Sequence, residues 1–415
     1  MTDCDWHLRL ARQLAELEVD HRLRRRRPTT PLDAVHVRSG DRTFVNFASN
    51  DYLGLARHPR VMEAAIKAVE RYGFGSGAAP LLTGYTDAHA SAESAIAAWK
   101  GTEAAVLFSS GYQANIAVVQ MLSAAGRSQD RAARFLLDKL CHASLIDAVR
   151  GNGSDSDSGY RVFPHNGITK LQRLLADASA AGRGNVIVTE SIFSMDGDAA
   201  DLPAVTQLYA ASDPTRPMLV VDEAHGSGVY GPAGAGWAAE IGISDRVDLS
   251  VVTLSKALGG IGAAVCGSKL LCDALVNLAR AYVFSTSMPA ATAAAAEAAI
   301  AVLRDEPHRQ QRLRSLARKV RVAIIKLGLE IPRGTVQPDD SPIIPIVLGD
   351  ESAALSAAAM LQDRGVLALP IRPPTVPAGG CRLRITLSSD HTDSHVEQLI
   401  DALLQLASTR KDRDD

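Results

Sequence analysis

A lysine follows a short apolar run in the second half of the chain, in a setting that could support covalent chemistry. The run covers residues 249–254 and leads through Ser255 to Lys256, with Gly259 and Gly260 close behind. A lysine desolvated at the end of a buried strand can lose its proton and form a Schiff base with a carbonyl compound. Glycines leave room beside such a lysine, and neighbouring hydroxyls can bind a phosphate. The plain alternative is a lysine that ends a strand in a salt bridge.

An aspartate and a histidine follow another apolar run. The run 218–222 ends in Asp222, and His225 lies three residues later. Residues 222–225 also spell a helicase DEAH box, but the chain contains no Gly-Lys dipeptide and so lacks the phosphate loop of a nucleoside triphosphatase. A buried aspartate can instead keep a pyridinium nitrogen protonated, which makes pyridoxal phosphate an electron sink.

Two further loops offer a phosphate site and a ring that could stack on a cofactor. Segment 109–115 follows the apolar run 104–108 and opens a helix, whose first backbone N–H groups can bind phosphate. His142 follows a run that ends at Asp138, and its imidazole could stack on an aromatic ring; the alternative is a structural histidine in a loop. The glycine-rich segment 73–77 resembles a dinucleotide turn but follows a helix instead of a strand, which is the wrong context.

These residues lie in a pattern of alternating helices and strands. Helical periods over 58–72 and 88–100 are followed by β-rich apolar runs at 104–108, 134–138, 185–189, 218–222, 249–254 and 263–266. This alternation predicts an α/β fold with a mostly parallel sheet covered by helices on both faces. Ligands of open α/β sheets bind at the carboxyl ends of the strands. We therefore expect one edge of the sheet to gather the polar residues that end the runs: Asp138, Glu190, Asp222 and Lys256.

Segments on either side of this pattern suggest two smaller parts. At the N-terminus, helical spacing predicts a helix over 5–23 that ends by Pro28, and a hairpin is expected over 35–47. After an Ala-rich helix at 290–304, the C-terminal region reads as a charged helix, two strands and two more helices, at 308–327, 343–347, 382–387, 352–364 and 393–407. The expected parts are 1–45 (helix and hairpin), 46–290 (large α/β domain) and 291–415 (small α+β domain), with 151–159 as a surface loop.

Composition excludes several classes of function. Lys and Arg number 44 against 46 Asp and Glu, a net charge of −2, which removes the electrostatic case for a nucleic-acid or anionic-membrane binder. The five scattered cysteines form no C-x-x-C pair and indicate neither a disulfide framework nor a zinc site. No run approaches the roughly 20 apolar residues that span a bilayer, and the N-terminus lacks the apolar core of a signal peptide. We expect a cytoplasmic protein with no metal.

Four longer motifs add a family resemblance. They are NFASNDYLGL at 46–55, ESIFSMDGD at 190–198, DEAHG at 222–226 and FSTSMP at 284–289. Together they resemble the α-oxoamine synthases, which are fold-type I pyridoxal phosphate enzymes, and the similarity extends from about Arg24 to Thr386. The resemblance implies a large, mostly parallel-sheet transferase domain with a smaller C-terminal α+β domain, a pyridoxal 5'-phosphate cofactor, and a homodimer with shared active sites.

Segments near the C-terminus narrow the implied activity. IRPPTVPAG at 371–379 and RLRITL at 382–387 are similar to the members of the family that serve biotin biosynthesis, and the segments at 75–77 and 83–85 agree. This implies decarboxylative condensation of L-alanine with a pimeloyl thioester of coenzyme A or of an acyl carrier protein. The alternatives are a sister activity, such as glycine with acetyl-coenzyme A, and a non-catalytic cofactor-binding protein, against which the retained Lys256 argues.

The resemblance also implies roles toward the cofactor. Lys256 would hold it as a Schiff base and later remove the α-proton of the substrate. Asp222 would keep the ring nitrogen protonated, and His225 would hydrogen-bond the ring oxygen, with Ser194 as a second candidate for that bond. The implied stacking residue is His142, and the implied phosphate ligands are Gly111, Tyr112 and Thr253, with Thr286 reaching across a subunit boundary.

Further residues are implied to bind the substrates. Arg384 would clamp the amino-acid carboxylate bidentately, a geometry that lysine cannot supply; the alternative is a surface arginine on a strand. Arg24 matches a family arginine near the acyl substrate, although its run of four arginines could simply be solvated. Asn50 would lie near the thioester, and Thr375 would offer a hydroxyl from a loop that prolines hold rigid. His142 would face the substrate as well as the ring.

Overall fold

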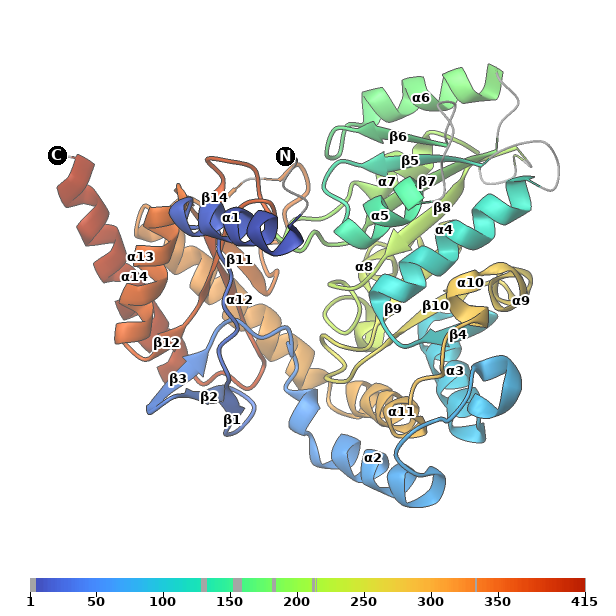
Figure 1. Cartoon of the computed structure of the whole chain (residues 1–415), viewed down its shortest axis with the longest axis horizontal. Helices are drawn as coiled ribbons and strands as arrows, with labels where there is room; N and C mark the ends of the chain where they lie inside the picture. The colour runs from blue at the N-terminus through green and yellow to red at the C-terminus, as the bar shows by residue number, and fades with distance from the viewer. Residues whose placement is uncertain are drawn as a thin grey trace.

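A seven-stranded sheet from the middle of the chain forms the centre of the fold (Figure 1). The computed structural model describes residues 5–127, 133–151, 159–180, 184–210, 213, 215–332 and 334–414. The strands are β4 (Ala104–Phe108), β5 (Arg134–Asp138), β6 (Tyr160–Phe163), β7 (Asn185–Glu190), β8 (Met218–Asp222), β9 (Leu249–Thr253) and β10 (Ala263–Gly267). Their order is β4-β10-β9-β8-β7-β5-β6, in which β10 runs antiparallel to both neighbours and the other pairs are parallel. The predicted α/β fold is confirmed; β6 was not predicted.

Alternate side chains of each strand enter hydrophobic cores on opposite faces of this sheet. On β5, Phe135 and Leu137 enter one core, and Leu136 enters another. The first face is covered by α4 (Gly111–Arg127), α5 (Ala143–Gly151), α9 (Lys269–Leu278) and α10 (Arg280–Val283). The second face is covered by α3 (Asp87–Lys100), α6 (Ile168–Ala180), α7 (Leu202–Gln207) and α11 (Ala290–Asp305). Burial on both faces explains why the strands read as continuous apolar runs.

A three-stranded antiparallel sheet organises the C-terminal part, which lies to the left of the large sheet in Figure 1. Its strands are β11 (Ile343–Gly349), β14 (Cys381–Thr386) and β13 (Leu369–Ile371), and α12 (Pro307–Lys326), α13 (Glu351–Asp363) and α14 (Asp393–Asp414) pack around it. Helix α11 packs instead against α2 (Pro59–Tyr72) and α3 beside the large sheet. The domain boundaries at 45 and 290 stay predictions.

The N-terminal segment joins the C-terminal part through backbone pairing. Strands β1 (Thr30–Pro31), β2 (His36–Ser39) and β3 (Arg42–Asn46) form the predicted hairpin region, and β3 pairs in parallel with β12 (Val366–Leu367). Helix α1 (Trp6–Val19) ends earlier than predicted, because His21 adopts a positive φ of 54°, outside the helical range. The shorter turns are η1 (Leu55–Arg57), η2 (Pro80–Gly84), η3 (Pro232–Gly234), α8 (Trp237–Glu240) and η4 (Ser244–Arg246). None of the described helices has the length and apolar character that a bilayer crossing needs.

Lys256 lies in a tight loop after β9, not at the strand end. The backbone N–H of Gly259 donates to the carbonyl of Lys256 at 2.8 Å, and Gly260 donates to Leu254 at 2.8 Å. Gly259 has a φ of 68°, and a Cβ added there would lie 2.1 Å from the backbone nitrogen of Ala56. The expectation that Gly259 leaves open room is therefore wrong, because the backbone of residues 55–56 fills that space.

Replacing this glycine is expected to disturb the fold around Lys256. For Gly259→Ala we expect a loss of roughly 2–6 kcal/mol in the free energy of unfolding, from backbone strain and from the clash with residues 55–56. The matched control is Gly184→Ala, because Gly184 has no left-handed φ and nothing within 4 Å of an added Cβ. Urea unfolding measures the free energy of unfolding of both variants. Equal losses in Gly259→Ala and Gly184→Ala would contradict the packing role of Gly259.

Candidate active site

The carboxyl ends of adjacent strands bring the predicted chemistry to one edge of the large sheet. Strands β5, β7 and β8 end in Asp138, Glu190 and Asp222, and the loop after β9 carries Lys256. Glu190 and Asp222 are direct partners in the register of β7 and β8, and both are buried. The strand order makes β7, β8 and β9 neighbours. The predicted gathering of polar residues at this edge is confirmed.

The electrostatic surroundings make the Lys256 amine a competent nucleophile. Burial lowers the pKa of Lys256 to about 8, although the negative charges of Asp222 and Glu190 raise it in part. Burial and the nearby charge of Asp222 raise the pKa of Glu190 well above its usual value. A lysine with so low a pKa has a substantial neutral fraction near neutral pH, and the neutral amine is the form that attacks a carbonyl carbon.

A chain of hydrogen bonds joins Asp222 to His142. Asn115 Nδ2 donates to Asp222 Oδ2 at 2.8 Å and to Ser144 Oγ at 2.9 Å, and Ser144 Oγ lies 2.8 Å from His142 Nδ1. The backbone N–H of Ala224 donates to the other Asp222 oxygen at 2.9 Å. Burial lowers the pKa of His142, so its ring is neutral near neutral pH. The sequence analysis gave Asn115 and Ser144 no role; the available signal was a polar residue at the start of each helix.

Tyr52 fixes the protonation of His225. The Tyr52 hydroxyl lies 2.6 Å from His225 Nδ1. Burial raises the pKa of Tyr52, and burial together with the positive charge of Lys256 lowers the pKa of His225 well below its usual value. The phenol therefore keeps its proton and has two acceptors in reach, His225 Nδ1 at 2.6 Å and Asn50 Oδ1 at 3.3 Å. Donation to the nearer one, Nδ1 of a neutral imidazole, leaves His225 Nε2–H as a donor. Tyr52 lies in the 46–55 motif, but its hydroxyl was not predicted to act.

The predicted phosphate ligands come together at the start of α4. A Cβ added to Gly111 would lie 2.7 Å from Thr253 Cγ2, so the two residues are in contact only because Gly111 has no side chain. Ser109 Oγ donates to the backbone oxygen of Thr286 at 3.5 Å, which brings Thr286 of the same chain beside this turn. The exposed Tyr112 donates its hydroxyl proton to Asp147.

Arg384 reaches the site from β14 and is held from two sides. Its Nε donates to the backbone oxygen of Ser194 at 2.6 Å, and its Nη1 donates to Asn50 Oδ1 at 3.1 Å. Arg384 is buried, so its reading as a surface arginine is wrong. The two bonds fix the plane of the guanidinium, which still has donors for a carboxylate. Arg382, two residues away, pairs with Asp196 in the same loop as Ser194.

The predicted acyl-binding residues also meet. Arg24 Nη2 donates to Thr375 Oγ1 at 3.2 Å and to the backbone oxygen of Pro373 at 3.5 Å. This contact joins the N-terminal segment to the loop before β14, across 351 positions of sequence. Both side chains are exposed and present N–H and O–H donors together.

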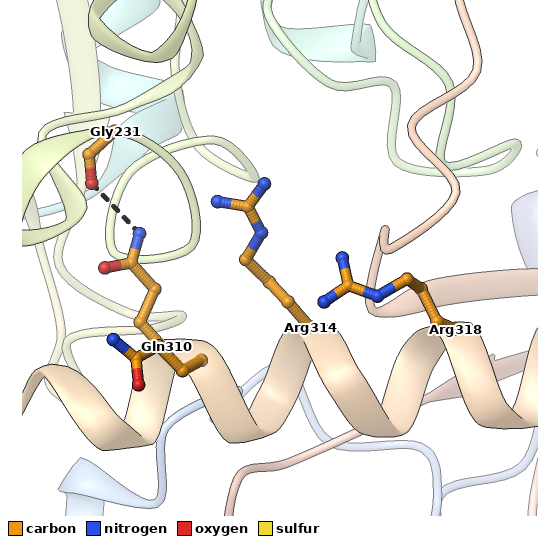
Figure 2. A pocket seen from close by; sticks show the side chains of 5 residues that line it. Gly231, Gln310, Arg314 and Arg318 are labelled. Carbon is orange, nitrogen blue, oxygen red and sulfur yellow. Dashed lines mark hydrogen bonds between the residues drawn. The ribbon is translucent and has the colours of Figure 1, made fainter.

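Figure 2 shows a separate cavity beside helix α12, lined by residues that are not among the predicted site residues. It has a volume of about 340 Å³ and is lined by Gly231, Gln310, Gln311, Arg314 and Arg318. Gln310 donates to the carbonyl of Gly231 at 3.0 Å, and Arg314 is paired with both Glu240 and Asp340. Arg318 is also paired with Asp340, so both arginines that line this cavity already have carboxylate partners.

The residues at the strand ends fit pyridoxal phosphate. A buried carboxylate suits the ring nitrogen, the His225 Nε2–H suits the ring oxygen, and a lysine of lowered pKa suits the aldehyde carbon. The bare backbone of Gly111 at the start of a 17-residue helix suits the phosphate. Asn115 Oδ1 and Ser191 Oγ are buried here without a protein hydrogen-bond partner among the described residues.

Known proteins are similar to this chain over almost its whole length. The family model "Aminotransferase class I and II" matches residues 42–403. The 8-amino-7-oxononanoate synthase of Anaeromyxobacter dehalogenans is 43% identical over 96% of this chain and 94% of its own. Serine palmitoyltransferase from Sphingomonas wittichii superposes with a TM-score of 0.86 at 27% identity, covering 99% of this chain and 98% of its own. The 8-amino-7-oxononanoate synthase of Francisella tularensis gives 0.74 at 27% identity, covering 90% and 99%.

The chain therefore belongs to the class I and II aminotransferase family, and its cofactor is pyridoxal 5'-phosphate, with which serine palmitoyltransferases of the same fold have been solved. Within that family it is an acyltransferase of the 8-amino-7-oxononanoate synthase group. The resemblance to the α-oxoamine synthases and the predicted fold type I are confirmed.

Removing the amide that links Asp222 to Ser144 is expected to weaken the site. In Asn115→Ala, two buried oxygens lose their donor, which should cost roughly 1–3 kcal/mol in the free energy of unfolding and raise the dissociation constant of the cofactor about tenfold. Asn277→Ala, which removes an exposed amide bonded to Asp273 O, is the control. Fluorescence titration with the cofactor and urea unfolding report the two effects, and unchanged cofactor affinity would contradict the role of Asn115.

Proposed function

We propose that this chain condenses L-alanine with a pimeloyl thioester. The Cα of alanine forms a bond to the thioester carbonyl carbon, the carboxylate leaves as carbon dioxide and the thiol is released, which gives 8-amino-7-oxononanoate. The observation that carries the proposal is the half-buried Lys256, whose amine has a lowered pKa that Asp222 raises in part and Arg384, a buried arginine held from two sides, lowers further. Relatives named 8-amino-7-oxononanoate synthase, which this chain matches over 94% of their length, support it.

The residues of the chain divide the work of binding and proton transfer. Lys256 Nζ would hold the cofactor at its aldehyde carbon and, as a free amine, would take the proton from Cα of alanine. Asp222 would keep a proton on the ring nitrogen, and His225 would donate from Nε2 to the ring oxygen. When bound, pyridoxal phosphate supplies a conjugated ring that accepts the electron pair left at Cα.

Further residues are proposed to fix the substrates. Arg384 binds the alanine carboxylate with the N–H groups left after its bonds to Ser194 and Asn50, and His142 covers the ring and the substrate. The phosphate would be held by Gly111, Tyr112 and Thr253, with Thr286 reaching it across the subunit boundary of the proposed homodimer. Ser194 is the second candidate for the ring oxygen.

The acyl end is proposed to lie at the contact of Arg24 and Thr375. A pimeloyl chain ends in a second carboxylate, which suits a guanidinium and a hydroxyl side by side. Its methylenes gain roughly 0.8 kcal/mol for each CH₂ removed from water. Acetyl groups have neither feature. Coenzyme A and an acyl carrier protein are the two carriers to compare.

A homodimer is part of the proposal. Phe74, Leu82 and Phe284 are more than two-thirds exposed. The segments around them are in contact, because Ser287 N donates to Ala78 O at 3.0 Å and Ser76 Oγ donates to Met288 O. Large apolar side chains exposed together are typical of a surface that another chain covers. The cytoplasmic location predicted from the sequence is kept as part of the same proposal.

The attachment of the cofactor can be mapped directly. Borohydride reduction of the holoenzyme should leave the pyridoxyl group on Lys256, and Lys256→Ala should keep its fold and lose turnover. Lys100 serves as the control, since it is half-buried and its Nζ bonds the backbone of Ala235; Lys100→Ala should still label at Lys256. Peptide mass spectrometry that finds the label elsewhere would overturn the assignment.

The substrates are tested by a panel of two amino acids and three acyl thioesters. We expect kcat/KM to be highest for alanine with a pimeloyl thioester, above glycine with acetyl or succinyl thioesters, with product identity confirmed by mass spectrometry. Arg24→Ala should raise the KM for the pimeloyl thioester and leave that for alanine unchanged, whereas Arg26→Ala, an exposed neighbour in the same basic run, should change neither. If a glycine reaction is fastest, the protein performs a sister activity.

A further inference from the structure

A histidine that the sequence analysis did not single out bridges two buried carboxylates. His165 follows β6; its Nδ1 lies 3.1 Å from Asp138 Oδ1, and its Nε2 lies 2.8 Å from Asp198 Oδ2. The side chains of Asp138 and Asp198 are 1% and 2% exposed, and that of His165 is 19% exposed. A neutral imidazole donates through one nitrogen only, so a ring that donates to both carboxylates carries a positive charge.

Each carboxylate belongs to a loop that carries residues of the active site. Asp138 ends β5 and accepts a hydrogen bond from the backbone N–H of Leu140 at 2.8 Å, at the start of the loop that leads to His142. Asp198 closes the loop after β7, where its backbone oxygen accepts from Phe193 N at 2.8 Å. The same loop contains Ser194 and Asp196, which bind Arg384 and Arg382.

The residues around His165 strengthen this connection. The backbone N–H of Asn166 donates to Asp138 Oδ2 at 2.9 Å, and its side-chain amide donates to Ala199 O at 3.0 Å. The ring of Phe193 lies edge-on to the His165 ring, with centroids 4.4 Å apart. Asn166 has a positive φ of 51°, a conformation that asparagine tolerates better than most residues. Segment 165–166 therefore ties both loops together through side chains and backbone.

We propose that His165 is a positioning residue of the active site: held between Asp138 and Asp198, it keeps the His142 loop and the Ser194 loop at a fixed separation. The working geometry of Arg384 toward the substrate carboxylate, and of His142 over the ring, depends on that separation. The three residues are named the Asp138–His165–Asp198 clamp. The inference rests on the proposed function for its amino-acid substrate and adds a residue to it.

The protonation of the clamp agrees with this role. Burial lowers the pKa of His165, but the hydrogen bonds and charges of Asp138 and Asp198 outweigh it and raise the pKa to about 10. These are the charged groups that face the ring from β5 and from the loop after β7; Glu190 lies beyond, near Asp138. Because the folded pKa is above the usual value of about 6.5, the stabilisation is complete below that value and is lost as pH rises through about 10.

The test combines steady-state kinetics with hydrogen exchange. In His165→Asn we expect the KM for alanine to rise tenfold or more and kcat to fall, up to the roughly 10²-fold that a misplacement of about 1 Å can cost, with the KM for the acyl thioester unchanged. In the cofactor-free protein, peptides covering 139–145 and 191–199 should both exchange faster than in wild type. His165→Lys restores a positive charge and should recover part of both effects.

The matched control is His58→Asn. His58 is also a buried histidine paired with a carboxylate, Glu306 at 3.1 Å, but at the start of α2. The His58→Asn variant should have a lower melting temperature, with the KM for alanine and the hydrogen exchange of peptides 139–145 and 191–199 unchanged. If His165→Asn behaves like this control, or loosens only one of the two loops, the positioning role is wrong. If His165→Asn does not fold, Asp198→Asn, which keeps shape and loses charge, takes its place in the same measurements.

Failure of the proposed function gives a different result. A protein that does not condense alanine with any pimeloyl thioester would still show the coupled loosening of both loops by hydrogen exchange if the clamp exists. The proposed function would be supported, and the clamp overturned, by two results together. The wild type would condense alanine with a pimeloyl thioester faster than it condenses glycine, and His165→Asn would leave hydrogen exchange in peptides 139–145 and 191–199 unchanged.

Discussion

Desolvation of the half-buried Lys256 beside the buried carboxylates Asp222 and Glu190 is the constraint on which the rest of the site depends. Taking a charged amine out of water is costly, so the group shifts toward its neutral form, and the pKa falls to about 8. The nearby carboxylates limit that fall in pKa, so the Lys256 amine can still accept a proton. Both consequences arise at the sheet edge where β7, β8 and β9 are neighbours and where Asp222 and Glu190 are buried.

The same burial obliges the other polar groups of the site to bind one another. Asn115 supplies donors to Asp222 and Ser144 at once, and Tyr52 supplies one to His225. Unpaired polar groups would be costly in this environment, whereas paired ones hold each ring in one tautomer and one orientation. The network therefore sets which nitrogen of His225 presents a proton, which is a chemical property and not only a structural one.

Different parts of the chain supply the two halves of the site. The large sheet contributes most of the residues proposed to bind the cofactor: Asp222 and Thr253 end β8 and β9, and Gly111, His142 and Lys256 follow the ends of β4, β5 and β9. The C-terminal part delivers Arg384 on β14 to the Ser194 loop, and the N-terminal segment delivers Arg24 to Thr375. The proposed substrate recognition thus depends on how the flanking parts pack against the sheet, and the β3–β12 pairing joins those two flanking parts to each other.

The sequence by itself determined the central strands and the identity of the reactive groups. A sheet buried on both faces requires continuous apolar runs, so the runs ending at Asp138 and Asp222 could be recognised locally. Strand β6 was not predicted, because it lies at the edge of the sheet and its residues Arg161 and Val162 are exposed. The roles of Asn115 and Tyr52 were not predicted either, because their partners are distant in the sequence. Asn115 bonds Asp222 across 107 positions, and Tyr52 bonds His225 across 173 positions. A periodic pattern reports which side of an element is buried; only the tertiary structure decides which distant group meets it there.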